Sequence, residues 1–320
     1  MPEPRWGFLI VAYLFLGGMS AGLFFVSALA TYLEDGRGAA YSRVARVGAL
    51  LAPWPVSLGS GLLVFDLGHW FRFYKLFVTF QWHSPMSIGA WLLAGFSGIT
   101  LAAFWAWLPE TTLPWLVRRL PKRLRFLSFV DHPSRGRWRR PLAMAGLPFS
   151  IGVGIYTGVL LGAVQARPFW NTNLVAQMFL FSALSSGCAV LILALGASRE
   201  GLDHSDAKLL YSLDITLLVL ELFIVLPYVI HGKLSPLSVQ RALDLILGGP
   251  FTVAFWGVFF TLGLVLPLAI ELWEMRPVLL NRAPLHPGRL LAGVSAALVL
   301  VGGFTLRYVF VSAGQMSTFQ

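Results

Sequence analysis

Long runs of apolar residues alternate with short polar segments along the whole chain. A helix of about 20 apolar residues crosses the hydrocarbon core of a bilayer, and each run reaches that length. Strands of a membrane barrel would alternate apolar and polar residues, and the runs show no such alternation. The pattern therefore predicts an all-α integral membrane protein. We expect eight spans, over residues 6–33, 44–67, 85–107, 141–166, 172–196, 209–232, 250–273 and 289–312.

The composition supports this class. Of the 320 residues, 57% are hydrophobic and 12% are charged, against about 25% charged in soluble domains. The net charge of +10 could suggest a nucleic-acid partner, but most basic residues lie in short segments beside the apolar runs. That placement is typical of membrane topology, so we expect no nucleic-acid partner.

The distribution of basic residues predicts the orientation. Seventeen of the 24 Lys and Arg lie in or beside the loops after spans 1, 3, 5 and 7, and six lie at the opposite ends. The positive-inside rule then places both termini outside the cytoplasm. The longest of these cytoplasmic loops, within 109–140, carries nine basic residues. We interpret it as a topology anchor that contacts anionic membrane lipid, with a dedicated protein partner as the alternative.

The chain repeats itself at an offset of 165 residues. Residues 20–22 (Ser-Ala-Gly) match residues 185–187 (Ser-Ser-Gly), each in the first span of its half. Four spans separate the copies, so both copies have the same orientation. The repeat predicts two parallel four-helix units, 1–166 and 167–320.

A glycine-lined helix face stands out in span 4. Gly154, Gly158 and Gly162 recur every four residues, which lets another helix approach closely. Tyr156 is turned about 200° away from that face. The hydroxyl of Tyr156 could therefore point into a cavity, or it could bond an ordinary neighbouring carbonyl.

Polar and aromatic residues gather at the outer ends of the first four spans. We expect Tyr13, Asp66, His69, Ser84 and Tyr156 to meet there. Apolar walls with a few polar groups suit a flat lipophilic ligand with carbonyl ends, and a quinone fits that description. Its reduction needs hydrogen-bond donors and proton carriers. The alternative is an interfacial aromatic belt, which explains Asp66 less well, because an acid at the end of a span needs a partner.

Three ionisable residues fall within the spans of the second half. Asp214 and Glu221 are seven residues apart on span 6, and Arg307 lies in span 8. Ionisable groups at membrane depth mark proton or substrate pathways, so this series predicts a proton path. A static Glu221–Arg307 ion pair is the structural alternative. Glu271 and Glu274 lie near the end of span 7, where we expect them to be solvated.

Resident metal cofactors are not expected. The single cysteine, Cys188, excludes an intramolecular disulfide and an all-cysteine iron–sulfur site within the chain. Haem held by two histidines needs residues that face each other inside the bundle. His69, His83 and His231 are the histidines near spans, and all three lie at the outer edge. We therefore expect neither haem nor another metal in this chain.

Five segments, in order, resemble the membrane subunits of polysulfide reductase-like complexes, the NrfD/PsrC type, over nearly the whole chain. They are Tyr-Leu-Phe-Leu-Gly-Gly-Met-Ser-Ala-Gly at 13–22, Asp-Leu-Gly at 66–68, Ser-Pro-Met-Ser at 84–87, Gly-Ile-Tyr-Thr-Gly-Val-Leu-Leu at 154–161, and Leu-Arg at 306–307 with Ala-Gly-Gln at 313–315.

The resemblance implies a multi-pass subunit in the cytoplasmic membrane of a prokaryote. Such subunits exchange electrons between menaquinone or ubiquinone and a ferredoxin-like iron–sulfur subunit, which serves a molybdopterin catalytic subunit. A tyrosine of the span-4 motif contacts the quinone, and Tyr156 matches it.

Two functions therefore compete. In the first, the protein is the quinone-reactive anchor of an oxidoreductase: Tyr156 and Tyr13 bond the quinone head, while Asp66 and His69 exchange protons. In the second, it is a secondary transporter built on the duplicated bundle, with Glu221 and Arg307 as the substrate or coupling site. A transporter of this kind should have broken helices at matching places in both halves.

Overall fold

The structure is a computed structural model that describes residues 6–33, 41–66, 81, 83–108, 135–280, 285 and 287–317. These residues form helices and their connections, and no strand occurs among them. The helices are α1 (Phe8–Leu33), α2 (Ser42–Leu51), α3 (Pro53–Asp66), α5 (Pro85–Trp107), η5 (Arg135–Trp138), α7 (Arg139–Gly162), α8 (Leu174–Gly196), α9 (His204–Leu234), α10 (Leu237–Leu247), η6 (Val253–Val265), α11 (Leu266–Leu279) and α12 (Arg289–Met316).

The prediction of eight membrane-spanning helices is confirmed. The described residues hold eight helices that are long and apolar enough to cross a membrane. Span 2 consists of α2 and α3, span 4 includes η5 and α7, and span 7 joins the π-helical η6 to α11. The other five spans are single helices.

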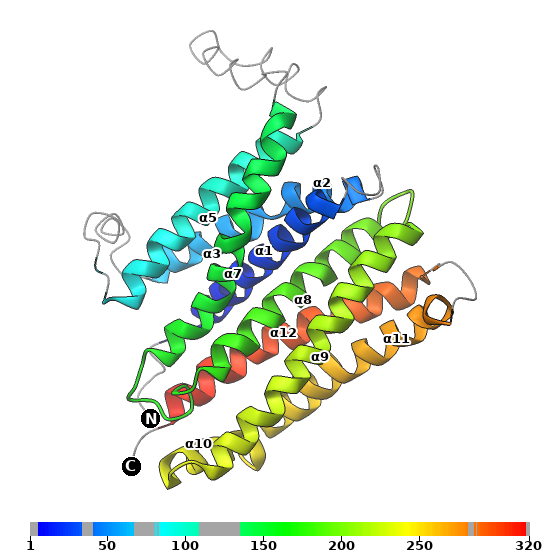
Figure 1. Ribbon diagram of the computed structural model, residues 1–320. Coiled ribbons are helices and arrows are strands. Elements are labelled where there is room, and N and C mark those ends of the chain that lie inside the picture. Colours follow the sequence, from blue (N-terminus) through cyan, green and yellow to red (C-terminus); the bar gives the residue numbers. More distant parts are fainter. Residues whose placement is uncertain are drawn as a thin grey trace.

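The helices lie side by side in a slanted bundle (Figure 1). Helices α1, α3, α5 and α7 occupy one side, and α8, α9, α11 and α12 occupy the other. Helix α1 packs against both α7 and α8, so it contacts helices on both sides of the predicted boundary at residue 166. The division into two parallel units stays a prediction.

The backbones of α1 and α8 touch at two glycines. A Cβ added to Gly22 would lie 3.0 Å from the Cα of Gly187 and would overlap the carbonyl oxygen of Ala183. A Cβ added to Gly187 would overlap the backbone of Gly22 in return. Helices in a membrane gain packing energy from such close approach, because lipid supplies no hydrophobic force between them. Gly22 and Gly187 are 165 residues apart, the offset of the sequence repeat.

Span 2 is interrupted between α2 and α3. Pro53 and Pro55 have no backbone N–H, so the helical hydrogen-bond ladder cannot continue through them. At the break, the hydroxyl of Ser20 on α1 donates a hydrogen bond to the carbonyl oxygen of Ala52 at 2.5 Å. A buried serine thus satisfies a backbone acceptor that water cannot reach.

The start of α1 and the end of α12 lie at the same end of the bundle (Figure 1). Gln315 near the end of α12 accepts a hydrogen bond from the Trp6 amide at 2.9 Å and donates one to the Trp6 carbonyl at 3.0 Å. Arg167, in the α7–α8 connection, donates to the carbonyls of Gln315 and Ser317. We call this the terminal end. Its placement outside the cytoplasm stays a prediction.

Two features differ from the expectation. A short helix, α10, follows α9 at the terminal end, where only a loop was expected. Span 7 continues to Leu279 rather than ending at residue 273. The hydropathy pattern missed this extension because the last turns carry Glu271, Glu274 and Arg276.

Candidate functional site

A cavity opens between the helices of the first half. Its volume is about 70 Å³, so it is a narrow slot, smaller than the pockets of about 300–1,000 Å³ that most small-molecule sites occupy. Helices α1, α3, α5 and α7 all contribute to its wall. The lining residues are Tyr13, Leu63, Met86, Gly89, Ala90, Leu93, Tyr156 and Leu160. We call it the tyrosine cavity.

The two tyrosines supply the polar side-chain groups of this otherwise apolar wall. Tyr13 is only 3% exposed, whereas Tyr156 is half-buried. Within the described part of the protein, neither phenol hydroxyl has a hydrogen-bond partner. Both hydroxyls are therefore available to a ligand. The sequence prediction that Tyr13 and Tyr156 lie together is confirmed.

Gly89 makes room for the phenol of Tyr156. A Cβ added to Gly89 would overlap the Cζ, Oη and Cε2 atoms of the Tyr156 ring. The ring therefore lies directly on the backbone of α5, and any larger residue at position 89 would displace it.

The glycine face of α7 lies on the side of α7 opposite Tyr156. A Cβ added to Gly154 would lie 2.8 Å from Leu180 Cδ1, and one added to Gly158 would lie 2.5 Å from Ala176 Cα. Both neighbours belong to α8. The predicted arrangement holds for Gly154 and Gly158, which pack against α8 while Tyr156 faces a cavity on the other side. Gly162 does not pack on a helix: a Cβ added there would lie 3.6 Å from the Trp170 carbonyl oxygen in the α7–α8 connection.

The other predicted members of the site are not among the described residues that line this cavity. Ser84 lies outside its lining and caps α5, since its hydroxyl accepts a hydrogen bond from the Ser87 amide at 3.4 Å. Asp66 is the last residue of α3. The side chain of Asp66 and the whole of His69 lie outside the described residues.

The three ionisable residues predicted in the second half are all buried. Asp214 and Arg307 are 0% exposed and Glu221 is 1% exposed. The Arg307 guanidinium donates to Ser182 Oγ at 2.7 Å, to the Gly303 carbonyl at 2.8 Å and to the Phe179 carbonyl at 3.3 Å. These bonds fix a charge that burial would otherwise make costly.

The alternative of a direct Glu221–Arg307 ion pair is not what the structure has. The two groups interact electrostatically, but these two described residues form no contact within the 4.0 Å of an ion pair. Ser182 lies between them as a shared polar neighbour, because it accepts from Arg307 and also interacts with Glu221. The arrangement is a spaced series of polar groups rather than a closed pair.

The expectation that Glu271 is solvated is wrong. Because α11 continues to Leu279, Glu271 lies two turns inside the helix and is 0% exposed. Its Oε1 accepts a hydrogen bond from Ser295 on α12 at 2.9 Å. Glu274, one turn further along, is half-buried and accepts hydrogen bonds from the Tyr211 hydroxyl and, at 2.8 Å, from the Gly288 amide. Ser295, a hydroxyl within an apolar run, was the sequence signal for such a partner.

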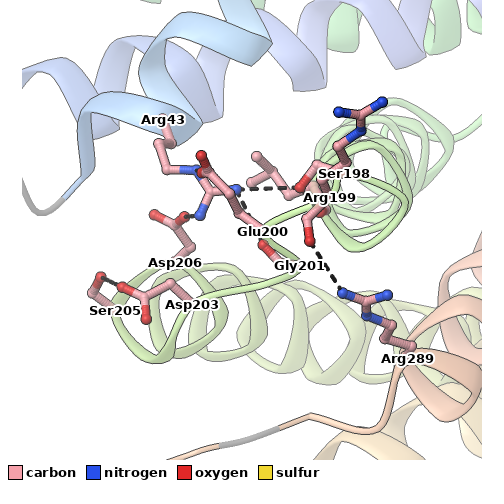
Figure 2. Close-up of polar contacts among 10 residues, drawn as sticks. Arg43, Ser198, Arg199, Glu200, Gly201, Asp203, Ser205, Asp206 and Arg289 are labelled. Atoms are coloured by element: carbon pink, nitrogen blue, oxygen red, sulfur yellow. Dashed lines mark hydrogen bonds and ion pairs between the residues drawn. The ribbon is translucent and has the colours of Figure 1, made fainter.

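A charged cluster links α2 to the segment that connects α8 and α9 (Figure 2). Arg43 on α2 lies 3.5 Å from Glu200 and 3.6 Å from Asp206. It also donates to Ser198 Oγ at 3.3 Å and to the Gly201 carbonyl at 3.1 Å. Asp206 is 1% exposed. In the sequence, Arg43 counted only as a topological charge, and its acidic partners were missed.

Within the described ranges, no group of three or more His, Cys, Asp or Glu side chains is arranged to hold a metal ion. The matched helix breaks expected of a transporter are also not found there. Span 2 is broken at Ala52, whereas the corresponding span 6 is the continuous helix α9, which passes through Pro227.

Comparison with known proteins bears on the whole sequence. Residues 2–318 match the family described as "Polysulphide reductase, NrfD". Protein NrfD of Escherichia coli (strain K12) is 32% identical, with 98% of this protein and 95% of the relative covered. A polysulfide reductase component of Wolinella succinogenes is 29% identical over 97% of this protein and 94% of its own length. A selenate reductase component of Mesobacillus selenatarsenatis is 26% identical, with 96% and 73% covered. With its eight spanning helices and this match from end to end, the protein belongs to the NrfD family of polysulphide reductase membrane proteins.

Proposed function

We propose that this protein is the quinone-reactive membrane anchor of a reductase complex. In this role it exchanges electrons between menaquinone or ubiquinone and a peripheral ferredoxin-like iron–sulfur subunit. That subunit passes them to or from a molybdopterin catalytic subunit, which holds the site for the terminal substrate. Two relatives are named as single components of a polysulfide reductase and of a selenate reductase, which supports the role of one subunit among several.

The tyrosine cavity is the observation that carries the proposal. A quinone head is flat and apolar with a carbonyl oxygen at each end, and it needs an apolar slot with hydrogen-bond donors. Tyr13 and Tyr156 offer two donors without internal partners among the described residues, between walls of Leu63, Leu93 and Leu160. Met86, which is 52% exposed, brings the cavity to the lipid-facing surface of the bundle. An isoprenoid tail could leave the cavity there.

The residues of this protein then have distinct roles. A bound quinone supplies two-electron, two-proton chemistry at its carbonyl oxygens. Tyr13 and Tyr156 orient the head by donating hydrogen bonds to those oxygens, and the leucine walls exclude water. Asp66 and His69 are proposed to exchange protons with the outer aqueous side. Because tyrosine hydroxyls both donate and accept, they can also hold a proton in transit.

We further propose that Asp214, Glu221 and Arg307 belong to a proton path, and the buried position of Glu271 adds a fourth member. The series runs along α9, α11 and α12, and buried hydroxyls of Ser182, Ser185 and Ser295 accompany it. Proton movement along it would make quinone turnover electrogenic. The spaced geometry of Glu221 and Arg307 supports a path more than it supports a structural ion pair.

The test of the quinone site is Tyr156→Phe, measured as quinol-dependent turnover of the assembled complex. Removing one hydroxyl keeps the ring on Gly89, so assembly should persist while turnover falls about 10-fold or more, as for the loss of a positioned donor. Tyr308→Phe, on the exposed face of α12, is the matched control and should leave turnover unchanged. Equal turnover of both variants and the wild type would remove Tyr156 from its role. Lipid extraction of the purified complex provides a second readout, because it should release bound quinone.

A further inference from the structure

Four helices of the second half each bring one polar side chain to the same buried place. Ser185 comes from α8, Asp214 from α9, Glu271 from α11 and Ser295 from α12. Ser185 Oγ donates to Asp214 Oδ1 at 2.5 Å, and Ser295 Oγ donates to Glu271 Oε1 at 2.9 Å. The two carboxyl groups also interact with each other. We call Asp214 and Glu271 the carboxyl pair.

Each member of the pair has one oxygen without a partner. Oδ2 of Asp214 and Oε2 of Glu271 are buried and accept no hydrogen bond from any described residue. In a membrane interior no bulk water can supply the missing donor, so such atoms are expensive to leave unpaired. Each serine donates to the second oxygen of its own carboxyl partner: Ser185 to Oδ1 of Asp214 and Ser295 to Oε1 of Glu271. The missing donor must therefore come from elsewhere.

The surroundings of the pair contain no cation among the described residues that interact with it. Its ionisable neighbours are Cys188 on α8, Tyr211 and Glu221 on α9, and Glu274 on α11. Arg307 interacts with Glu221 instead. Two adjacent carboxylates that are buried without a positive charge repel each other strongly, and such pairs avoid full ionisation by retaining a proton.

We propose that Asp214 and Glu271 share a single proton, and that this carboxyl pair is the proton-holding site of the path. One proton bound to one of the two unpaired oxygens makes that oxygen a hydrogen-bond donor. The unpaired oxygen of the other carboxyl accepts the bond, so both oxygens gain a partner. A second proton is not needed to pair these atoms, because the remaining two oxygens already accept from serines. The proposal deepens the proposed proton path, but its test does not require quinone turnover.

Tyr211 connects the pair to the end of the bundle away from the termini. Its hydroxyl donates to Glu274, which lies half-buried near the end of α11, and Tyr211 also interacts with Asp214 and Glu271. To load the pair, Glu274 first takes a proton from water and becomes the donor in its hydrogen bond with Tyr211. The Tyr211 hydroxyl, no longer donating to Glu274, then gives its own proton to the pair as its oxygen takes the proton of Glu274, so that tyrosine ends neutral and Glu274 ends as the carboxylate. One O–H bond is broken and one is formed at each transfer.

Infrared spectroscopy of the complex in lipid tests the sharing directly, because a protonated carboxyl has a carbonyl band that a carboxylate lacks. Asp214→Asn and Glu271→Gln are nearly isosteric, and the new amide supplies the donor that the proton supplied. Each single variant should therefore lose the same one band. The double variant should lose no second band. If the two variants lose different bands, or if the double variant loses two, each acid holds its own proton and the proposal is overturned.

Two further measurements keep the proposal testable should a carboxyl variant fail to assemble. Ser185→Ala and Ser295→Ala each remove one donated hydrogen bond, so both should shift the same carbonyl band without removing it. Shifts of two different bands would contradict a shared proton. Glu221→Gln is the control and should leave the band of the pair in place, since loss of that band would assign the proton to Glu221 instead. Tyr156→Phe should lower quinol turnover and leave all of these carbonyl bands unchanged. The quinone-site proposal and the shared-proton proposal can therefore be rejected independently of each other.

Discussion

Gly89 on α5 and Tyr156 on α7 are in direct contact: the phenol ring lies where a side chain at position 89 would begin. This contact fixes the position of the ring in the tyrosine cavity from the side opposite α8. The glycines of α7 fix it from the other side, because they hold α7 close to Ala176 and Leu180. The hydroxyl of Tyr156 is thus placed by two helix contacts rather than by a hydrogen bond.

Gly89→Ala should therefore disturb the cavity without unfolding the protein. The added Cβ meets the end of a side chain and not a backbone, so the ring of Tyr156 can move aside. The cost in free energy of unfolding should be about 1 kcal/mol, the low end of the usual range for overpacking, because the clash relaxes by side-chain movement. Quinol turnover should fall about as far as in Tyr156→Phe.

Gly98→Ala is the matched control on the same helix, because a Cβ there meets nothing within 4 Å. It should leave turnover unchanged and can stabilise α5 by up to about 1 kcal/mol, since alanine loses less entropy than glycine in a helix. Normal turnover in Gly89→Ala would show that the position of the Tyr156 ring is not critical.

Gly187→Ala should destabilise the whole bundle. Its Cβ would overlap the backbone of Gly22 on α1, and a backbone cannot move aside as a ring can. Forcing α1 and α8 apart should cost about 1–3 kcal/mol, the usual range for overpacking. Thermal unfolding in detergent measures the loss.

Gly196→Ala, at the end of the same helix α8, has nothing within 4 Å of its added Cβ and should change stability by less than about 0.5 kcal/mol. Equal melting temperatures of the two alanine variants would mean that α1 and α8 are not in the close contact described above.

Much of the membrane architecture could be predicted from the sequence, because each span is a mostly apolar run and the bilayer sets its length. The glycine spacing of span 4 also predicted a packed face with Tyr156 opposite. These features depend on local periodicity alone. The expected topology placed Tyr13 beside Tyr156, since it brings the outer parts of spans 1 and 4 to one depth.

The residues that sequence reasoning misplaced depend on tertiary partners. Glu271 looked like a solvated end of a span, because its partner Ser295 lies on another helix. Ser84 looked like a ligand contact, although its hydroxyl caps α5. Arg43 looked like one topological charge among many, and only the fold brings Asp206 to it. No local pattern identifies a partner that lies far away in the sequence.

Arg43→Gln should weaken the charged cluster shown in Figure 2. Asp206 would remain buried without a cation, and neither of its carboxylate oxygens has a hydrogen-bond partner among the described residues. The loss should be about 1–3 kcal/mol, less than for a fully buried pair because the Arg43 side chain keeps 32% of its surface exposed. Denaturation by heat or denaturant measures it.

Two variants calibrate that result. Arg46→Gln removes an exposed charge from the same helix and should be nearly neutral. Asp206→Asn in the Arg43→Gln background removes the unpaired charge and should recover a part of the lost stability. A double variant less stable than Arg43→Gln alone would argue against an unpaired Asp206 as the cause.

Glu221→Gln should separate proton movement from electron transfer. Glu221 interacts with both Asp214 of the carboxyl pair and Arg307, and its helix α9 does not line the tyrosine cavity. The amide keeps the volume and the neighbours of Glu221 but cannot accept and release a proton at physiological pH. In proteoliposomes containing the complex, quinol turnover without a membrane potential should therefore persist. The number of protons moved per quinol should fall severalfold.

Asp244→Asn, at an exposed acid paired with Lys233, is the matched control and should move protons like the wild type. An unchanged proton-to-quinol ratio in Glu221→Gln would remove Glu221 from the path and return it to a structural role beside Arg307.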